Sequence, residues 1–373
     1  MLEGRERALA TVDLAAVSHN VRRLMSLLPR GGALCAVVKA NGYGHGALPV
    51  ARAALRAGAT WLGVATAAEA EELREAAIEA PMLVFGPLTG DELRRAAKAQ
   101  AEVVVWSEAM LREALRLQVR LHVKYDTGMG RLGVGARDAA SLCDAAARAR
   151  CLSGLMTHFA TADEEDDAFF RLQLQRFTDL AAKVKTTFPD TICHAANSAA
   201  TLREPAAHFD LVRTGIAVYG LSPFHDDPAV HDLRPVMRLS SYLADVREVA
   251  AGDSVGYGRS FVAESPARIG IVPIGYADGI ARALSNRGEV LIGGRRCPIS
   301  GTVSMDQMTV LLPGDHGAPG DEVVFIGESG GASGGERILA EEVARLLGTI
   351  NYEITCGVGL RVVRRFTGGV TLV

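Results

Sequence analysis

The chain has 373 residues, 49% of them hydrophobic, with 40 basic and 43 acidic side chains, a net charge of −3 and a pI near 6.3. This near-neutral balance argues against a nucleic acid or an anionic membrane surface as partner, because both select a clustered basic excess. The hydrophobic content excludes intrinsic disorder. Because the length exceeds what one compact core usually holds, we expect two domains.

The six cysteines are scattered along the chain and form no C-x-x-C pair. Such spacing indicates neither a zinc site nor a disulfide framework, so we expect no metal. The opening residues, MLEGRERALATVDL, lack the apolar core of a signal peptide, and no apolar run approaches membrane-spanning length. We therefore expect a cytoplasmic protein with reduced cysteines.

The first predicted element is a helix over 15–28, in which Val17, Val21 and Leu24 recur at helical spacing. Eight apolar, strand-like runs follow, most of them separated by amphipathic stretches such as 66–77 and 90–100. The runs cover 33–40, 61–66, 82–87, 103–106, 121–125, 152–160, 191–196 and 211–220.

Apolar strands joined by helices are typical of a parallel sheet that is buried on both faces. Eight strands close a (β/α)8 barrel, and an open doubly wound sheet is the alternative. We favour an α/β fold with an N-terminal (β/α)8 TIM barrel over residues 10–235. The reason is that polar residues follow the carboxyl ends of several runs, where such barrels carry their chemistry.

From residue 236 the sequence changes to short Val- and Ile-rich segments broken by Gly, Pro and Asp. This pattern predicts a C-terminal, mostly-β domain over 236–373, together with residues 1–9, and one helical patch at 338–348. The Gly- and Ser-rich stretch 328–336 is predicted to be a surface loop, and the acidic run 163–167 to be a solvated helix start.

Lys39 ends the first strand-like run and precedes NGYGHG. A half-desolvated lysine has a lowered pKa, and its neutral amine can then act as a nucleophile or a base. The glycines allow tight turns and a close approach of the backbone to a ligand. A surface lysine at a strand end is the alternative.

Polar residues also follow the later runs: Lys124, Asp126 and Arg131 after the fifth, His158 after the sixth, Asn197 and Ser198 after the seventh, and Arg213, Thr214, Gly215 and Ile216 in the eighth. The loops after strands seven and eight of such barrels often bind phosphate. A buried structural role for His158 and Arg213 is the alternative. An amine and a phosphate cradle at one barrel mouth together indicate pyridoxal phosphate, held as a Schiff base.

In the β region, Tyr257 and Tyr276 lie among glycines in VGYGRSF and PIGYADG, and SMDQM places Met305 and Asp306 in another turn. Tyrosines in such settings serve either packing or function.

Seven strings resemble the motifs of the alanine racemase family, in the family's order: AVVKANGYGHG, KYDTGMGRLG, HAANSAAT, VRTGIAVYG, VGYGRSF, IGYADG and SMDQM. The resemblance implies a fold-type III pyridoxal phosphate enzyme that acts as a homodimer with shared active sites. It also implies racemisation of alanine, which supplies D-alanine for peptidoglycan.

The resemblance further implies roles for single residues. Lys39 would bind the cofactor and act as one acid–base group, Tyr257 of the partner subunit would be the other, and Arg213 would face the pyridine nitrogen. The remaining cofactor contacts would come from Tyr43, Ser198, Gly215 and Ile216 at the phosphate, with His158 and Asn197 nearby. Arg131, oriented by a carbamylated Lys124, and the backbone of Met305 would bind the substrate carboxylate, and Tyr276 would line the substrate channel.

Elementary chemistry agrees with these roles. Inverting Cα requires one base on each face of a planar carbanion, so two different groups are expected. Arg213 cannot give up its proton, so the ring nitrogen would stay unprotonated, a weaker electron sink that limits side reactions.

Three alternatives remain at this stage: a racemase of broader specificity, an amino-acid decarboxylase of the same fold, and a non-catalytic cofactor-binding protein. Arg213 argues against the decarboxylase, which typically has an acid at the ring nitrogen, and the long β region argues against the third. One position departs from the family pattern, because Leu360 stands where a tyrosine usually contributes to the phosphate site. The resemblance implies that this contact is lost or replaced.

Overall fold

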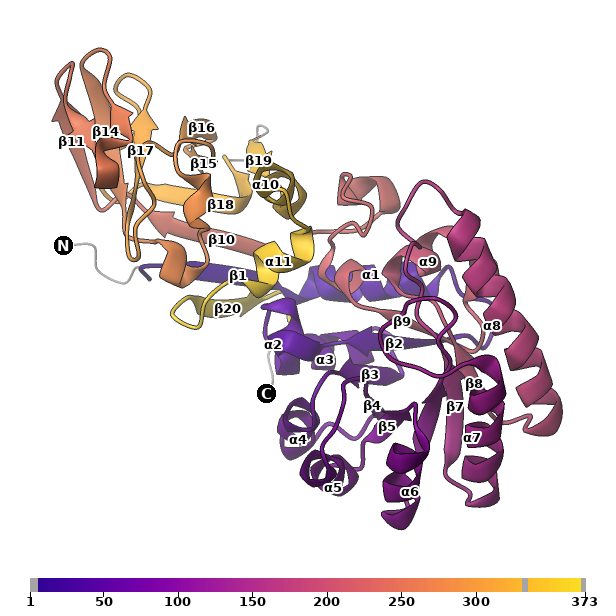
Figure 1. Ribbon diagram of the computed structural model, residues 1–373. Coiled ribbons are helices and arrows are strands. Elements are labelled where there is room, and N and C mark those ends of the chain that lie inside the picture. Colours follow the sequence, from indigo (N-terminus) through magenta and orange to yellow (C-terminus); the bar gives the residue numbers. More distant parts are fainter. Residues whose placement is uncertain (1–5, 331–334, 370–373) are drawn as a thin grey trace. The chain divides into compact units, whose positions relative to one another are not determined.

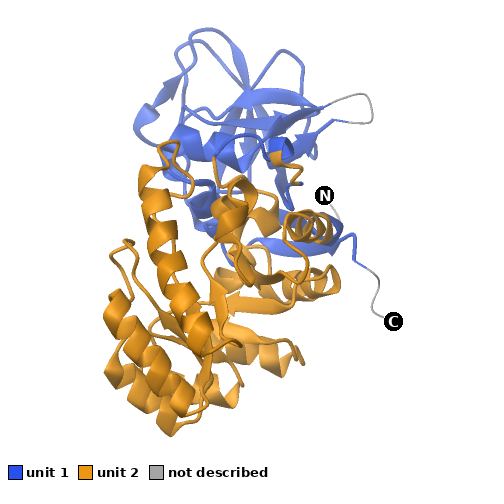
Figure 2. Cartoon of the chain, turned by 90° about the vertical axis from the view of Figure 1, so that its right-hand side faces the viewer, with its two compact units in different colours: residues 1–16, 225–230, 234–373 blue, residues 17–224, 231–233 orange. Residues whose placement is uncertain are grey.

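The computed structural model describes residues 6–330 and 335–369, which form two compact units (Figures 1 and 2). Unit 1 takes the chain as far as Ala16, then His225–Val230, and the chain from Arg234 onward; unit 2 takes Val17–Phe224 and His231–Leu233. The N-terminal part of unit 1 extends past residue 9 because strand β1 (Leu9–Asp13) pairs with strands from the C-terminal half.

Unit 2 contains an eight-stranded parallel sheet in the order β8-β7-β6-β5-β4-β3-β2-β9. Its strands are β2 (Ala33–Val37), β3 (Trp61–Val64), β4 (Met82–Val84), β5 (Glu102–Val105), β6 (Leu121–Lys124), β7 (Leu152–Met156), β8 (Ile192–His194) and β9 (Leu211–Thr214). Two backbone hydrogen bonds link the last neighbours, from Asp210 N to Cys193 O (3.0 Å) and from Arg213 N to Ala196 O (2.9 Å). The predicted barrel is therefore confirmed as a nearly closed one, and each predicted run overlaps one strand, although β5 begins one residue before its run.

Helices alternate with these strands, and Figure 1 shows α4 to α8 arranged around the outside of the sheet. The helices are α1 (Leu14–Met25), α2 (Lys39–Tyr43), α3 (Ala47–Arg56), α4 (Ala67–Glu75), α5 (Gly90–Lys98), α6 (Glu108–Arg116), α7 (Ala136–Arg148), α8 (Ala168–Thr187) and α9 (Ser198–Arg203). Capping boxes begin α4 and α5, with Thr66 and Glu69 in the first and Thr89 and Glu92 in the second. The predicted helix at 15–28 is confirmed by α1, and the acidic run 163–167 ends at the N-cap of α8, as predicted.

Unit 1 is rich in β structure, as predicted, and contains sheets of seven, three and two strands. In the largest sheet β1 lies between β10, to which it is antiparallel, and β20, to which it is parallel. The other strands are β10 (Met237–Tyr242), β11 (Asp245–Val249), β12 (Ser254–Val255), β13 (Phe261–Val262), β14 (Ala267–Val272), β15 (Glu289–Ile292), β16 (Arg295–Pro298), β17 (Met308–Leu312), β18 (Glu322–Ser329), β19 (Glu336–Ile338) and β20 (Val363–Thr367).

Two helices, α10 (Ala340–Leu347) and α11 (Asn351–Cys356), complete unit 1, and α10 confirms the predicted helical patch. The predicted loop at 328–336 is strand at both ends, and its residues 331–334 lie outside the described residues. Within residues 6–330 and 335–369, no helix is long and apolar enough to cross a membrane.

Candidate active site

Lys39 lies just beyond the carboxyl end of β2, which stops at Val37. The sequence predicts Lys39 at the end of the strand, whereas in the structure the lysine opens the turn that follows it. Residues 40–43 all have positive φ angles, between 51° and 61°. This left-handed conformation brings Cβ against the following carbonyl and is unfavourable by about 1–2 kcal/mol for each residue other than glycine. Surrounding groups must therefore hold the turn in place.

Two side chains, those of Glu69 and Asn41, support this turn. Glu69 accepts hydrogen bonds from Ala40 N and Ala65 N, both at 2.7 Å. Asn41 accepts a hydrogen bond from Ala47 N through its side-chain oxygen (3.1 Å). The carboxylate that caps α4 thus also holds the backbone next to Lys39.

Tyr43 ends the turn and is buried against Tyr219, with ring centroids 4.9 Å apart. The Tyr219 hydroxyl donates to Val37 O (2.9 Å), which ties this ring to the end of β2. Gly215 approaches Tyr43 so closely that a Cβ at position 215 would overlap the Tyr43 hydroxyl and lie 2.9 Å from its Cζ. The structure therefore brings together Tyr43 and Gly215, both predicted at the phosphate.

Two further predicted residues lie at the start of α9. Asn197 is the N-cap and accepts a hydrogen bond from Ala200 N (3.0 Å). Ser198 Oγ accepts from Gly215 N (3.1 Å) and Ala217 N (3.3 Å). Because both of these bonds use the oxygen as acceptor, the hydroxyl proton of Ser198 can be donated to a ligand. Ile216 is buried and begins the 3-10 helix η2 (Ile216–Tyr219).

Arg213 is almost completely buried within β9. Its terminal nitrogens donate to His194 Nδ1 (2.9 Å), Thr157 O (2.8 Å) and Ala195 O (3.0 Å). Burial lowers the pKa of Arg213 to about 10, so the group stays a cation at neutral pH. Among the described residues none accepts a hydrogen bond from its Nε–H, which leaves that donor for a ligand.

Lys124 ends β6 and is also buried. Burial lowers its pKa to about 8, and the positive charges of Arg213 and Arg131 act in the same direction. The pKa of His158 lies well below its ordinary value, mainly because the ring is buried. Four positive charges lower it further: those of Arg213, Lys124, Arg131 and Lys39. The structure therefore brings all four cations close to a neutral His158.

This concentration of positive charge fits an anionic ligand. Asp126 is the one acidic group whose charge raises the pKa of Lys124, and its carboxylate is also bonded to Gly128 N (2.9 Å) and Gly130 N (3.0 Å). The Thr214 hydroxyl is buried, and no described group bonds it. The cations and the hydroxyls of Ser198 and Thr214 can bind phosphate and carboxylate oxygens of a ligand. A primary amine such as that of Lys39 can react with a carbonyl group of the same ligand.

Three other predicted residues, Tyr257, Tyr276 and Met305, lie in unit 1, and all three are exposed. Tyr257, the most exposed at 73%, begins the 3-10 helix η4 (Tyr257–Arg259). Tyr276 N donates to Ser304 O (3.0 Å), and Ala277 N to Met305 O (3.1 Å), so the predicted channel residue and the predicted carboxylate binder lie in adjoining loops.

Asp278 joins these loops to two other parts of unit 1. Its fully buried carboxylate accepts from Gly275 N (2.9 Å), from Arg361 Nε (3.1 Å) and from both terminal nitrogens of Arg7. Arg361 also donates to Asp306 (2.8 Å) in the SMDQM turn. Leu360, next to Arg361, is 94% exposed.

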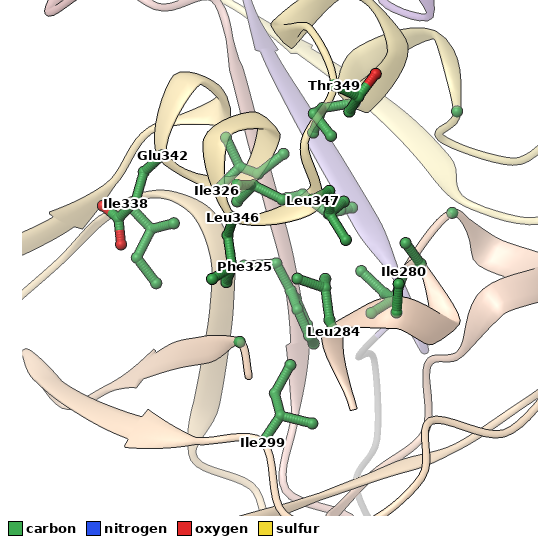
Figure 3. A pocket seen from close by; sticks show the side chains of 18 of the residues that line it. Ile280, Leu284, Ile299, Phe325, Ile326, Ile338, Glu342, Leu346, Leu347 and Thr349 are labelled. Carbon is green, nitrogen blue, oxygen red and sulfur yellow. The ribbon is translucent and has the colours of Figure 1, made fainter. Parts of the chain in front are cut away.

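A cavity of about 390 Å³ in unit 1 lies between α10, α11 and the sheet (Figure 3). Its walls are mainly apolar, for example Leu284, Phe325 and Leu346, and they include none of the predicted site residues. Three glutamates line it: Glu289 and Glu342 are bound to Arg296, and Glu353 accepts from the Thr349 hydroxyl. The cavity therefore offers apolar surface without the charge that the barrel site has, and we assign no ligand to it.

Several residues that shape the site are not among those predicted from the sequence. A signal existed for Glu69, because the capping box T-x-x-E at 66–69 is visible in the sequence. Nothing in the sequence indicates that Tyr219 bonds Val37 O or that Asp278 bonds Arg7, because these partners are more than 180 residues apart.

Comparison with known proteins gives concordant results. The family model for the alanine racemase N-terminal domain matches residues 12–223, and that for the C-terminal domain matches 236–366. The alanine racemase of Symbiobacterium thermophilum is 44% identical, over 99% of both chains. The crystal structure of alanine racemase from Streptomyces lavendulae, a producer of D-cycloserine, superposes with a TM-score of 0.92 at 43% identity, over 99% of both chains. A Bartonella henselae alanine racemase with covalently bound pyridoxal phosphate has a TM-score of 0.86 at 28% identity, and the match covers 96% of this chain and 99% of that one.

Proposed function

The chain belongs to the alanine racemase family, and we propose that it interconverts L-alanine and D-alanine with pyridoxal phosphate as its cofactor. The observation that carries this proposal is the group of cations that surrounds His158 at the barrel mouth, with the amine of Lys39 among them. A covalently bound cofactor in the Bartonella henselae relative supports the choice of ligand.

The cofactor, when bound, supplies an electron sink that acidifies the Cα–H bond of the amino acid. Lys39 would bind it covalently, and the Nε–H of Arg213 would donate to its ring nitrogen. The phosphate would lie among the residues that surround the Tyr43–Gly215 contact: Tyr43, Ser198, Gly215 and Ile216, with Asn197 and His158 beside them. Arg213 keeps its proton, so it positions the ring without protonating it.

Two groups would move the proton at Cα. The Lys39 amine would take or return it on one face, and Tyr257 of the partner subunit on the other. A planar carbon that is protonated from either face gives either enantiomer, so each direction of the reaction uses one group as base and the other as acid. The exposure of Tyr257 in this chain supports its use in a second copy.

Arg131 and the backbone of Met305 would bind the substrate carboxylate, and Tyr276 would line the channel. We propose that Lys124 is carbamylated and orients Arg131. The lowered pKa of Lys124 supports this, because only the neutral amine attacks CO2. The ammonium group first releases one proton; the neutral nitrogen then bonds the carbon of CO2 and releases a second proton, so a cation becomes an anion beside two arginines.

The direct test is a racemisation assay with L-alanine and with D-alanine, followed by a panel of larger amino acids. We expect turnover of both alanine enantiomers and complete loss in Lys39→Ala. Release of CO2 from the substrate would identify a decarboxylase instead, and equal turnover of larger amino acids a broad racemase. A protein that binds the cofactor but turns over none of these would refute the proposal.

Mixing two inactive variants tests the shared site of the proposed homodimer. A hybrid dimer contains one Lys39→Ala chain and one Tyr257→Phe chain. One of its two sites has both native groups only if Tyr257 serves the partner subunit. Random mixing makes about half of the dimers hybrids, so we expect about a quarter of the wild-type activity to return. If Tyr257 served its own chain, no site would be complete and no activity would return.

We further propose that the product D-alanine supplies peptidoglycan synthesis in the cytoplasm. The corresponding test is growth of a bacterium that lacks alanine racemase and requires D-alanine. Expression of the wild-type chain should remove that requirement, and expression of Lys39→Ala should not.

A further inference from the structure

A line of buried polar side chains crosses the interior of the barrel in unit 2. It begins at Arg213 in β9, passes through His194 in β8 and His122 in β6, and ends at Glu102, the first residue of β5. The successive distances are 2.9 Å from Arg213 Nη1 to His194 Nδ1, 2.8 Å from His194 Nε2 to His122 Nδ1, and 2.9 Å from His122 Nε2 to Glu102 Oε2. Both imidazoles are fully buried. The line therefore connects the barrel mouth with the amino ends of the strands.

The chemistry of Arg213 fixes the direction of every bond in this line. A guanidinium can only donate, so His194 Nδ1 accepts. Burial and the charge of Arg213 keep the pKa of His194 well below its ordinary value, so the ring is neutral and its single proton lies on Nε2. That proton is donated to His122 Nδ1, and His122 Nε2–H then donates to Glu102.

Glu102 is the acceptor that completes the line. Burial raises the pKa of its carboxyl, but the hydrogen bond from His122 and the groups Ser153 and Arg120 outweigh burial, so the pKa lies below its ordinary value. Arg120 itself reaches Glu102 at 3.2 Å and Ser153 at 2.8 Å. Glu102 is therefore an anion at neutral pH and accepts hydrogen bonds from both His122 and Arg120.

The neighbouring strand leaves room for this arrangement. Gly154 in β7 faces the His122 ring, and a Cβ there would overlap Nδ1 and lie 2.7 Å from Cε1. The Trp61 ring contacts the same imidazole edge-on, with centroids 5.6 Å apart. His122 is thus held in one orientation by its packing as well as by its hydrogen bonds.

We propose that Glu102, His122 and His194 are positioning residues for the proposed racemase reaction, which orient Arg213 and supply its counter-charge from a distance. No carboxylate bonds Arg213 directly in the described structure, so no adjacent negative charge offsets that of the guanidinium at the barrel mouth. His194 occupies Nη1 and, together with His122, transmits the effect of the carboxylate, while Nε–H is left to donate to the ring nitrogen of the cofactor. A carboxylate in direct contact would compete for these donors.

The first test uses the protein without cofactor and does not depend on activity. Nitrogen-15 NMR distinguishes the protonated from the unprotonated nitrogen of each imidazole. We expect His194 and His122 to carry their single proton on Nε2. A proton on Nδ1 of either ring, or a doubly protonated ring at neutral pH, would overturn the proposal.

The second test uses the cofactor-loaded enzyme. Glu102→Gln keeps an oxygen that can accept from His122 but removes the charge. We expect kcat to fall about fivefold with KM for alanine changed less than twofold, and the visible band of the bound cofactor to move. The matched control is Glu113→Gln, which removes a carboxylate from an exposed pair with Arg116 on α6 and should change neither quantity.

A merely structural role predicts a different result. If Glu102→Gln lowers the unfolding temperature but leaves the cofactor band and kcat unchanged, the positioning role is wrong. If the wild-type chain binds cofactor but does not racemise alanine, the proposed function is wrong. In that case the visible band of the bound cofactor and the protonated nitrogens seen by NMR still test whether Glu102, His122 and His194 position Arg213. If Glu102→Gln does not fold, the wild-type NMR result decides alone.

Discussion

Replacing Lys124 with methionine measures how strongly unit 2 opposes a charged amine at the end of β6. The pKa of Lys124 falls from the ordinary 10.5 to about 8, mainly because of burial. A difference of that size corresponds to roughly 3 kcal/mol between the charged and neutral forms. Methionine has a similar length and no charge, so at pH 7 in CO2-free buffer we expect Lys124→Met to be more stable than the wild type by up to about 3 kcal/mol.

The pH dependence has a definite sign. Because the folded-state pKa of Lys124 is the lower one, the unfolded chain binds more protons between pH 8 and 10.5. The free energy of unfolding of the unmodified wild type should therefore rise as the pH rises through this window, and the rise should be absent in Lys124→Met. Urea unfolding at several pH values gives both quantities.

Bicarbonate adds a second arm to this experiment. Carbamylation removes the buried cation, so bicarbonate should stabilise the wild type and leave Lys124→Met unchanged. Lys98→Met is the matched control, because Lys98 is exposed on α5 and its removal should have little effect in either buffer. The reasoning is refuted if wild type and Lys124→Met have the same free energy of unfolding at pH 7 without CO2. It is also refuted if bicarbonate does not change the free energy of unfolding of the wild type.

Two further substitutions test the contacts around the turn at residues 40–43. Gly215→Ala places a Cβ against the Tyr43 hydroxyl, so we expect cofactor affinity, measured by absorbance titration, to fall at least tenfold; Gly135→Ala, which meets nothing within 4 Å, should leave the affinity unchanged. Tyr219→Phe removes the hydrogen bond to Val37 O and should lower the free energy of unfolding by about 1 kcal/mol in urea; no change would show that this bond does not support the turn.

The barrel could be predicted from the sequence because its signals are local. Each parallel strand is buried on both faces, so it reads as an apolar run, and helix-start signals such as the Thr89 capping box separate the runs. The positions of Lys39, Lys124 and Arg213 at the carboxyl ends of strands could be predicted for the same reason.

The supporting interactions could not be predicted, because they join residues that are far apart in the chain. In the sequence His122 and His194 look like ordinary strand residues. Only the folded barrel brings His122 Nδ1 within 2.8 Å of His194 Nε2. The left-handed turn after Lys39 could not be predicted either, since Ala40 and Tyr43 both favour other conformations. Glu69 stabilises that turn through a backbone bond that no sequence pattern specifies.

The pairing of β1 with β10 and β20 also affects how the chain is made. The ribosome completes β1 about 220 residues before β10 begins, and β20 comes later still. At about 5–20 residues per second, β1 waits roughly 10–45 s for its first partner. Ala10 and Val12, both fully buried in the finished sheet, are exposed to solvent and to other nascent chains during that time. Unit 2 can close within this interval, so the earliest strand to be synthesised is among the last to be folded.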